Sequence, residues 1–137
     1  MANKRGVIEM KELSLTKGRH EIKSVFTGKV IEKSIFGHTV EDVLDIEKHM
    51  EVAREAMFYE QPYYDEIVVY VTGLTPLFQA VFAAWLDVRC GPPWTLDMPR
   101  GTLTFAHYNR ETDSYVLVDA LTGKTRQKPV PANADDK

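Results

Sequence analysis

The segment EIVVYVT, residues 66–72, most strongly limits how this chain can fold. It is a nearly continuous run of β-branched and other apolar residues, which predicts a strand that is buried on both faces. Gly73 interrupts the run. Thr75 and Pro76 then favour a helix start, because threonine caps the first turn and proline is tolerated at the first helical position. We therefore expect a buried strand that turns directly into a helix over residues 76–90.

Three segments before this unit predict an antiparallel β-meander. Residues 7–15, 20–26 and 30–36 have apolar residues at the spacing of strands, and they are separated by short turns around Gly18 and Gly28. The pattern changes to helical periodicity after the third segment, with Thr39 as a candidate cap. One face of this first helix collects apolar residues at spacings of three and four: Val43, Ile46, Met50, Ala53 and Met57.

The C-terminal part predicts a β-hairpin. Residues 102–108 and 115–121 are strand-like and flank the polar sequence NRETDS, whereas the proline-rich sequence of residues 91–101 indicates a loop. From Thr122 the chain lacks apolar spacing, which is typical of a disordered tail over residues 122–137. We expect an α+β protein with one domain over residues 1–121, in which a meander, two helices, a buried central strand and a closing hairpin follow one another.

Composition narrows the class of protein. The chain has 137 residues and a formal net charge of -3, which argues against a general nucleic-acid binder. Its apolar runs are far shorter than the roughly 20 residues that span a bilayer, and its N-terminus lacks an apolar signal core. Cys90 is the single cysteine, so no internal disulfide can form. We expect a protein of the cytoplasm with no membrane partner.

The turn between the buried strand and its helix is the first candidate site. Backbone N–H groups at a helix start, together with the positive end of the helix dipole, suit a phosphate. Thr72, Gly73 and Thr75 are the candidate ligand-binding residues there. The alternative is a compact turn without a ligand, because TGLTP has one glycine and not the spacing of a phosphate-binding loop.

HYNRETD, residues 107–113, is the second candidate site. Arg110 can hold a phosphate with its planar, two-pronged guanidinium, and Glu111 or Asp113 can accept hydrogen bonds from ribose hydroxyls. Asn109 adds an amide. The alternative is a solvated hairpin turn with no ligand.

Catalytic patterns are sparse. The four histidines do not have the spacing of metal ligands, no cysteine pair exists, and no serine lies in a nucleophile elbow. This favours a binding protein over an enzyme, with no catalytic residue, metal or cofactor expected.

The sequences YVTGLT and TLTFAHYNRET, with a helix after the first, resemble the first type of the phage Thoeris anti-defence family over roughly residues 18–118. Members of that family sequester cyclic ADP-ribose-type signals (gcADPR isomers), made by bacterial TIR-domain enzymes, and some also bind cyclic trinucleotides. They do not cleave the signal, and they assemble from dimers, sometimes into hexamers.

By this resemblance Phe82 and the pair Arg110–Glu111 would contact the signal molecule, and Phe78 and Arg19 complete the candidate set. The family's polar pocket residues between helix and hairpin have no counterpart in GPPWTLDMPRG. Two alternatives remain, a ring nuclease that degrades cyclic oligonucleotides and an interaction module without a ligand. The aromatic residues Phe78, Phe82 and Trp85 also suggest that the second helix packs against another subunit.

Overall fold

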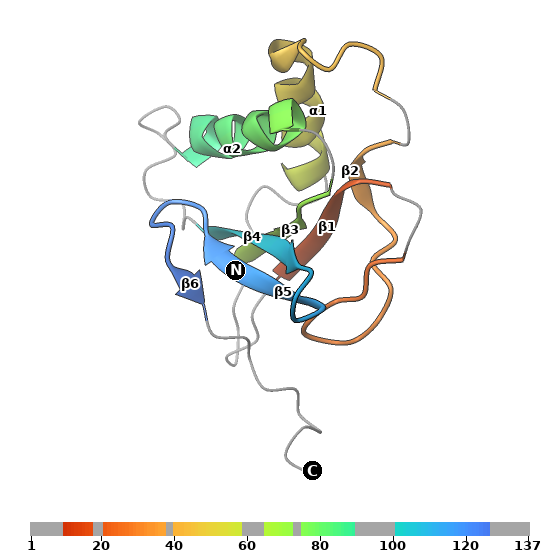
Figure 1. The fold of residues 1–137 in the computed structure, drawn as a ribbon. Coiled ribbons are helices and arrows are strands. Elements are labelled where there is room, and N and C mark those ends of the chain that lie inside the picture. The colour runs from red at the N-terminus through yellow and green to blue at the C-terminus, as the bar shows by residue number, and fades with distance from the viewer. Residues whose placement is uncertain are drawn as a thin grey trace, which may run out of the picture.

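The computed structural model describes residues 10–17, 21–37, 40–58, 65–72, 75–89 and 101–126. Along the chain the elements are β1 (Met10–Thr16), β2 (Ser34–Phe36), α1 (Ile46–Phe58), β3 (Glu66–Tyr70), α2 (Thr75–Arg89), β4 (Thr102–Asn109), β5 (Ser114–Asp119) and β6 (Thr125–Arg126). Both helices lie on one side of the sheet (Figure 1). Two helices on one face of a mixed sheet confirm the predicted α+β class.

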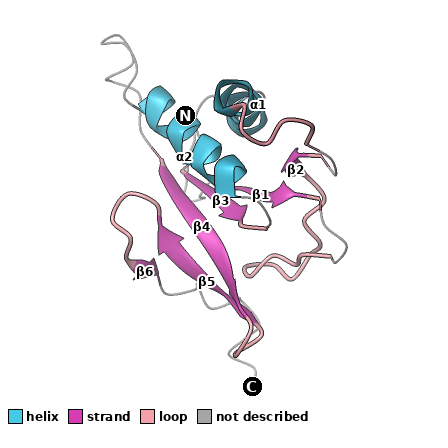
Figure 2. Ribbon diagram, turned by 45° about the horizontal axis from the view of Figure 1, so that its top comes forward, coloured by secondary structure: helices cyan, strands magenta, loops and turns pink. Residues whose placement is uncertain are grey.

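The sheet has the strand order β2-β1-β3-β4-β5-β6. β1, β3 and β4 run parallel to one another, and β5 and β6 continue the sheet as antiparallel strands. β3 is therefore flanked by strands on both sides and covered on both faces, and each of its residues is buried. α2 begins at Thr75, and β4 and β5 form the predicted closing hairpin (Figure 2). These three sequence predictions are confirmed.

The predicted antiparallel meander is wrong. β1 pairs with β2 in parallel, and the segment between them contributes one isolated antiparallel bridge, between Lys23 and Val30. The glycine turn does form, with Gly28 at φ 79. The segment does not extend into a ladder because Ser24 bends it, accepting bonds at its hydroxyl from the N–H groups of Phe26 (3.0 Å) and Thr27 (3.1 Å).

Contacts with the far face of the sheet hold this segment in place. The Ser24 hydroxyl donates to the Glu12 carboxylate at 2.7 Å, and the Tyr70 hydroxyl donates to the same oxygen at 2.8 Å. Tyr70 in turn accepts a hydrogen bond from the N–H of Val25 at 3.0 Å. Ile22 is buried beside these groups. Long-range contacts therefore replace the strand pairing that local periodicity predicts.

Ionisation of the Tyr70 hydroxyl should make the stability of the protein depend on pH in the alkaline range. Burial, with the neighbouring Glu12 carboxylate, raises the pKa of Tyr70 above its ordinary value of 10.0. The folded state therefore favours the neutral phenol. Its contribution to stability is complete below pH 10 and is lost as the pH rises further, by about 1.4 kcal/mol per pH unit.

We expect denaturant unfolding at pH 9, 10 and 11 to show this decline in the wild-type protein and a weaker decline in Tyr70→Phe. Other tyrosines titrate in both proteins, so the difference between the two curves isolates Tyr70. Parallel curves would mean that Tyr70 ionises as easily in the folded chain as in the unfolded one.

The first helix starts later than its sequence pattern suggests. α1 begins at Ile46, and Asp45 caps it by accepting at its carboxylate from the Lys48 N–H at 3.3 Å. The candidate cap Thr39 lies outside the described residues. His49 stabilises the turn before the helix, because its Nε2 lies 2.8 Å from the carbonyl oxygen of Asp42 and 3.1 Å from that of Val43.

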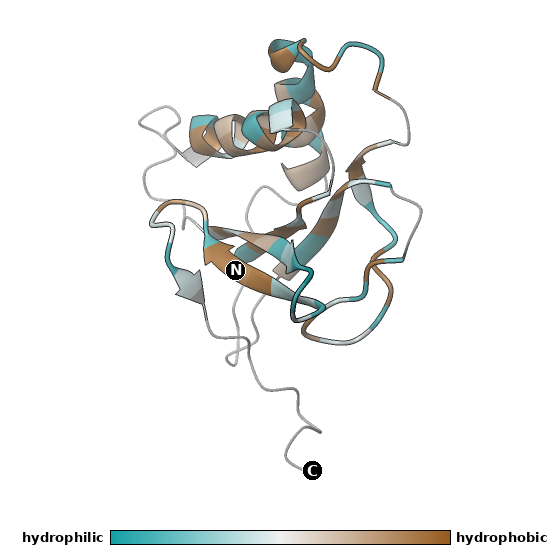
Figure 3. Cartoon of the chain, in the orientation of Figure 1, coloured by the Kyte–Doolittle hydropathy of each residue, from teal (hydrophilic) through white to brown (hydrophobic). Residues whose placement is uncertain are grey.

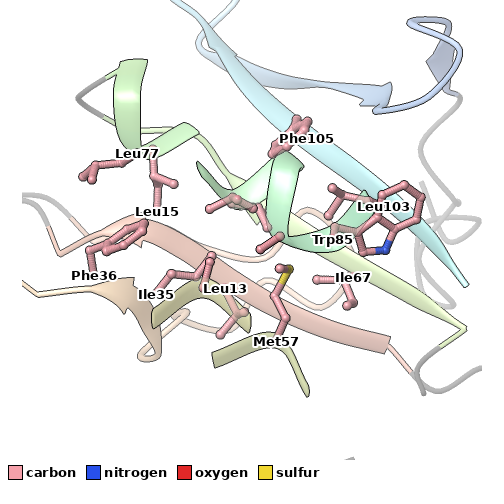
Figure 4. Packing of buried hydrophobic residues seen from close by; sticks show 14 residues of the cluster. Leu13, Leu15, Ile35, Phe36, Met57, Ile67, Leu77, Trp85, Leu103 and Phe105 are labelled. Atoms are coloured by element: carbon pink, nitrogen blue, oxygen red, sulfur yellow. The ribbon is translucent and has the colours of Figure 1, made fainter. Parts of the chain in front are cut away.

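The main core lies between the helices and the sheet. Figure 4 shows side chains from both helices interleaved with those from β1, β2, β3 and β4. Trp85 belongs to this core, at 5% exposure, and Phe78 and Phe82 pack partly buried against it. The chain itself therefore covers Trp85 fully and Phe78 and Phe82 in part.

The predicted start of the disordered tail, at Thr122, is also wrong. The Asp119 carboxylate accepts from the N–H groups of Leu121 (2.9 Å) and Thr122 (3.0 Å), and Gly123 adopts φ 73 to complete a turn into β6. Residues 122–124 thus belong to this turn and residues 125–126 to the sheet, and not to a disordered tail. The remainder of that predicted tail, residues 127–137, lies outside the described residues. In the described part of the chain, the helices are too short or too polar to cross a membrane.

Candidate functional site

The carboxyl ends of the parallel strands place the first candidate site. Because β1, β3 and β4 are parallel, they end at the same edge of the sheet, where β3 leads into α2. Ligands of open α/β sheets commonly bind at such an edge. Thr72 and Thr75 both lie there, as the sequence predicts, and Gly73 lies outside the described residues.

The Thr72 hydroxyl has a structural role. Its hydroxyl oxygen lies 3.1 Å from the backbone nitrogen of Thr16 and accepts that N–H. It also lies 2.9 Å from the Thr16 hydroxyl. These bonds join the ends of β1 and β3 beyond their last paired residues. Thr75 is exposed as the first residue of α2 and is the more accessible of the two candidates.

An aromatic cluster borders this edge. The Phe78 ring lies 4.5 Å from the Phe105 ring and 6.0 Å from the His107 ring, between centroids. Phe82 lies one turn further along α2 and contacts Phe105 edge-on at 6.4 Å. Phe78 is therefore the aromatic candidate at the edge, and Phe82 is held against the core.

His107 is a site residue that the sequence motif alone did not single out. Side chains alternate between the two faces of a strand, so Phe105 and His107 share the helix-facing side of β4. That two-residue alternation is the signal that identifies His107. Burial lowers the pKa of its imidazole, which favours the neutral ring at pH 7. A neutral imidazole beside Phe78 offers a flat surface with one donor and one acceptor.

The hairpin tip is polar and largely exposed, and Figure 3 shows it in the hydrophilic colour next to the hydrophobic colour of β5. The Asn109 amide oxygen accepts from the Glu111 N–H at 2.9 Å, so Asn109 shapes the turn. Arg110 and Glu111 are both exposed, and Arg110 makes no ion pair with any residue in the described part of the chain.

The sheet separates the residues of the HYNRETD motif. Tyr108 points to the face opposite His107, where its ring contacts Tyr115 at 5.5 Å. Its hydroxyl donates to the Asp113 carboxylate, and this bond is the main reason why the pKa of Tyr108 is raised. Asp113 is thus engaged within the turn. The structure brings Phe78 close to His107 and leaves Arg110 and Glu111 at the tip. Arg19 lies outside the described residues.

Two hollows lie elsewhere, on either side of a floor formed by Ile35 and Val52 between β2 and α1. Their volumes are about 500 Å³ and about 390 Å³. Of the predicted ligand-binding residues that the structure describes, none lines them. We call this region the β2–α1 surface.

Among the described residues, no group of three or more histidine, cysteine, aspartate or glutamate side chains is placed to hold a metal ion. Comparisons with known proteins add no identity, because no protein-family model, curated protein or solved structure matches this chain.

Proposed function

We propose that this protein binds and sequesters a small nucleotide-type signal, of the cyclic ADP-ribose class or a cyclic trinucleotide, without cleaving it. The observation that carries the proposal is the pairing of Phe78 with neutral His107 at the edge where β3 leads into α2. A nucleobase stacks on such aromatic surfaces, and the start of a helix attracts phosphate oxygens. In this proposal the protein acts in the cytoplasm of a bacterial host to block Thoeris immunity.

Arg110 supplies the third part of the proposed site. It follows His107 by three positions, in the turn directly after the end of β4, and its side chain is exposed. A guanidinium at this position can pair with a phosphate in a charge-assisted, two-pronged contact. An aromatic surface, a helix start and a guanidinium are together suited to a ligand with a base and a phosphate.

The test is incubation of the protein with cyclic ADP-ribose isomers and cyclic trinucleotides, followed by removal of free ligand, heating and mass analysis of what is released. Recovery of an intact ligand supports sequestration. A cleaved product would identify a ring nuclease, and no retained ligand from any probe would leave an interaction module as the function.

Ligand binding should also stabilise the folded state. A ligand at 100 times its dissociation constant adds about 2.7 kcal/mol to the free energy of unfolding. For a domain of this size the melting temperature should rise by roughly 5–15 °C. Thermal unfolding across the same panel of nucleotides measures the rise, and an unchanged melting temperature with every member would contradict the proposal.

A further inference from the structure

The smaller hollow of the β2–α1 surface, of about 390 Å³, combines an apolar floor with an acidic rim. Four apolar side chains from β2, α1 and the loop between them form the floor: Ile35, Phe36, Val40 and Val52. Three carboxylates and one ammonium group form the rim: Glu41, Asp42, Asp45 and Lys48. The rim therefore has an excess of negative charge, which attracts a cation.

The carboxylates of the rim keep oxygen atoms free for a ligand. Asp42 uses Oδ1 to accept the N–H of Leu44 at 3.2 Å. Asp45 uses Oδ1 to accept the N–H of Lys48 at 3.3 Å. The Oδ2 atoms of both aspartates have no hydrogen-bond partner in the described part of the chain, where Glu41 and Lys48 also form no ion pair. Each of the three carboxylates can therefore accept an N–H group from a ligand.

His49 adds an unpaired acceptor to this hollow. It lines the hollow and is 5% exposed. Its Nε2 lies 2.8 Å from the carbonyl oxygen of Asp42 and 3.1 Å from that of Val43. Carbonyl oxygens only accept, so Nε2 carries the hydrogen, and Nδ1 of the neutral ring is an acceptor. Nδ1 makes no hydrogen bond in the described part of the chain, where every fully buried side-chain nitrogen has a partner. It is therefore reached from outside, through the hollow.

We propose that this hollow binds a linear polyamine, in which ammonium groups are separated by methylene chains. Among the described residues, no three acidic or histidine side chains are placed to hold one metal ion, so the acceptors of the rim do not converge on a single point. Several separated positive charges fit this arrangement, whereas a compact cation reaches only part of it. The ammonium groups donate to the carboxylates of the rim and to Nδ1 of His49.

The floor fits the methylene chains of such a ligand. Ile35 and Phe36 of β2 and Val52 of α1 present carbon atoms between the polar groups. Methylene groups that cover this apolar surface leave water and so contribute to binding. The volume of the hollow lies within the range of about 300–1,000 Å³ that is typical of small-molecule sites.

Calorimetry with spermidine in about 0.1 M salt tests the site. We expect saturable binding of one spermidine molecule per chain. Hexaamminecobalt(III) is the control ligand, because it has the same charge and N–H donors but no methylene chain. It should bind at least about tenfold more weakly, since it cannot cover the apolar floor. No saturable binding of spermidine up to about 1 mM, or equal affinity for the two cations, would overturn the proposal.

Two double variants with the same change in net charge locate the ligand. Glu41→Gln with Asp45→Asn keeps an acceptor that caps α1 and should weaken spermidine binding by at least about tenfold. Glu51→Gln with Glu55→Gln is the matched control, because both residues are exposed on α1 and neither lines this hollow. Its affinity should stay within about twofold of the wild type. Circular dichroism confirms that the variants are folded. Equal losses in the two double variants would mean general attraction by charge and would overturn the proposal.

Two more measurements separate bound polyamine from a structural effect of these changes. Lys48→Gln removes the positive charge of the rim and should tighten spermidine binding by about two- to fivefold. In nitrogen NMR spectra, the Nδ1 resonance of His49 should shift when spermidine saturates the protein, and that of His107 should not. Binding that Lys48→Gln does not tighten, or a His49 resonance that does not move, would place spermidine outside this hollow.

The hollow shares no residue with the proposed nucleotide site at Phe78, His107 and Arg110. The spermidine titrations are therefore done without nucleotide. A protein that binds spermidine and retains no nucleotide would contradict only the proposed function, and the reverse result would contradict only the polyamine site.

Discussion

Phe105→Ala is expected to lower the free energy of unfolding by about 3–5 kcal/mol. Phe105 is 4% exposed on the helix-facing side of β4, and its ring contacts the rings of Phe78, Phe82 and His107. Truncation removes the buried ring and leaves a cavity between α2 and the sheet, which the surrounding side chains only partly fill. Phe78 and His107 also lose their shared support, so any nucleotide bound there should be bound more weakly.

Phe105→Leu is the matched control for this change. Leucine keeps most of the apolar volume, so the expected loss is below about 1.5 kcal/mol. Urea or guanidinium unfolding of the three proteins measures both effects. A loss from Phe105→Ala as small as the loss from Phe105→Leu would mean that Phe105 does not support the junction between α2 and β4.

Arg110→Ala is expected to leave the fold intact and to weaken binding of the proposed nucleotide ligand by about 10- to 150-fold. The side chain is exposed and has no ion pair in the described part of the chain, so its removal should change stability by no more than about 0.5 kcal/mol. A charge-assisted bond to a phosphate contributes about 1.5–3 kcal/mol, which gives the expected loss of affinity.

Two further variants separate a phosphate contact from a general effect of charge. Arg110→Lys keeps the positive charge but loses the planar fork, so affinity should still fall. Lys124→Ala removes an exposed charge from the turn between β5 and β6 and should leave the affinity for the ligand unchanged. Calorimetry on the folded variants provides the measurement. An unchanged affinity in Arg110→Ala would place the ligand elsewhere on the protein.

Only part of the candidate site could be predicted from the sequence. Arg110 and Glu111 lie at the exposed tip of a hairpin, as the polar sequence between two strands predicts. The role of Thr72 was not predictable, because its hydrogen-bond partner Thr16 is 56 positions away. His107 and Tyr108 are adjacent in the chain and point to opposite faces of the sheet, so the motif HYNRETD does not form a single site.

The elements that sequence alone determined are those in which neighbouring residues decide the structure. The β-branched run of β3, the Thr75–Pro76 start of α2 and the polar turn between β4 and β5 all lie where the local pattern places them. The strand partners were decided by tertiary structure. The alternation of apolar and polar residues fits an antiparallel meander as well as it fits the observed sheet. Hydrogen bonds to Tyr70 and Glu12 hold the segment after β1 against the far face of the sheet. β2 then pairs in parallel with β1. These bonds join residues up to 58 positions apart, a separation at which no periodic pattern along the chain specifies which groups will meet.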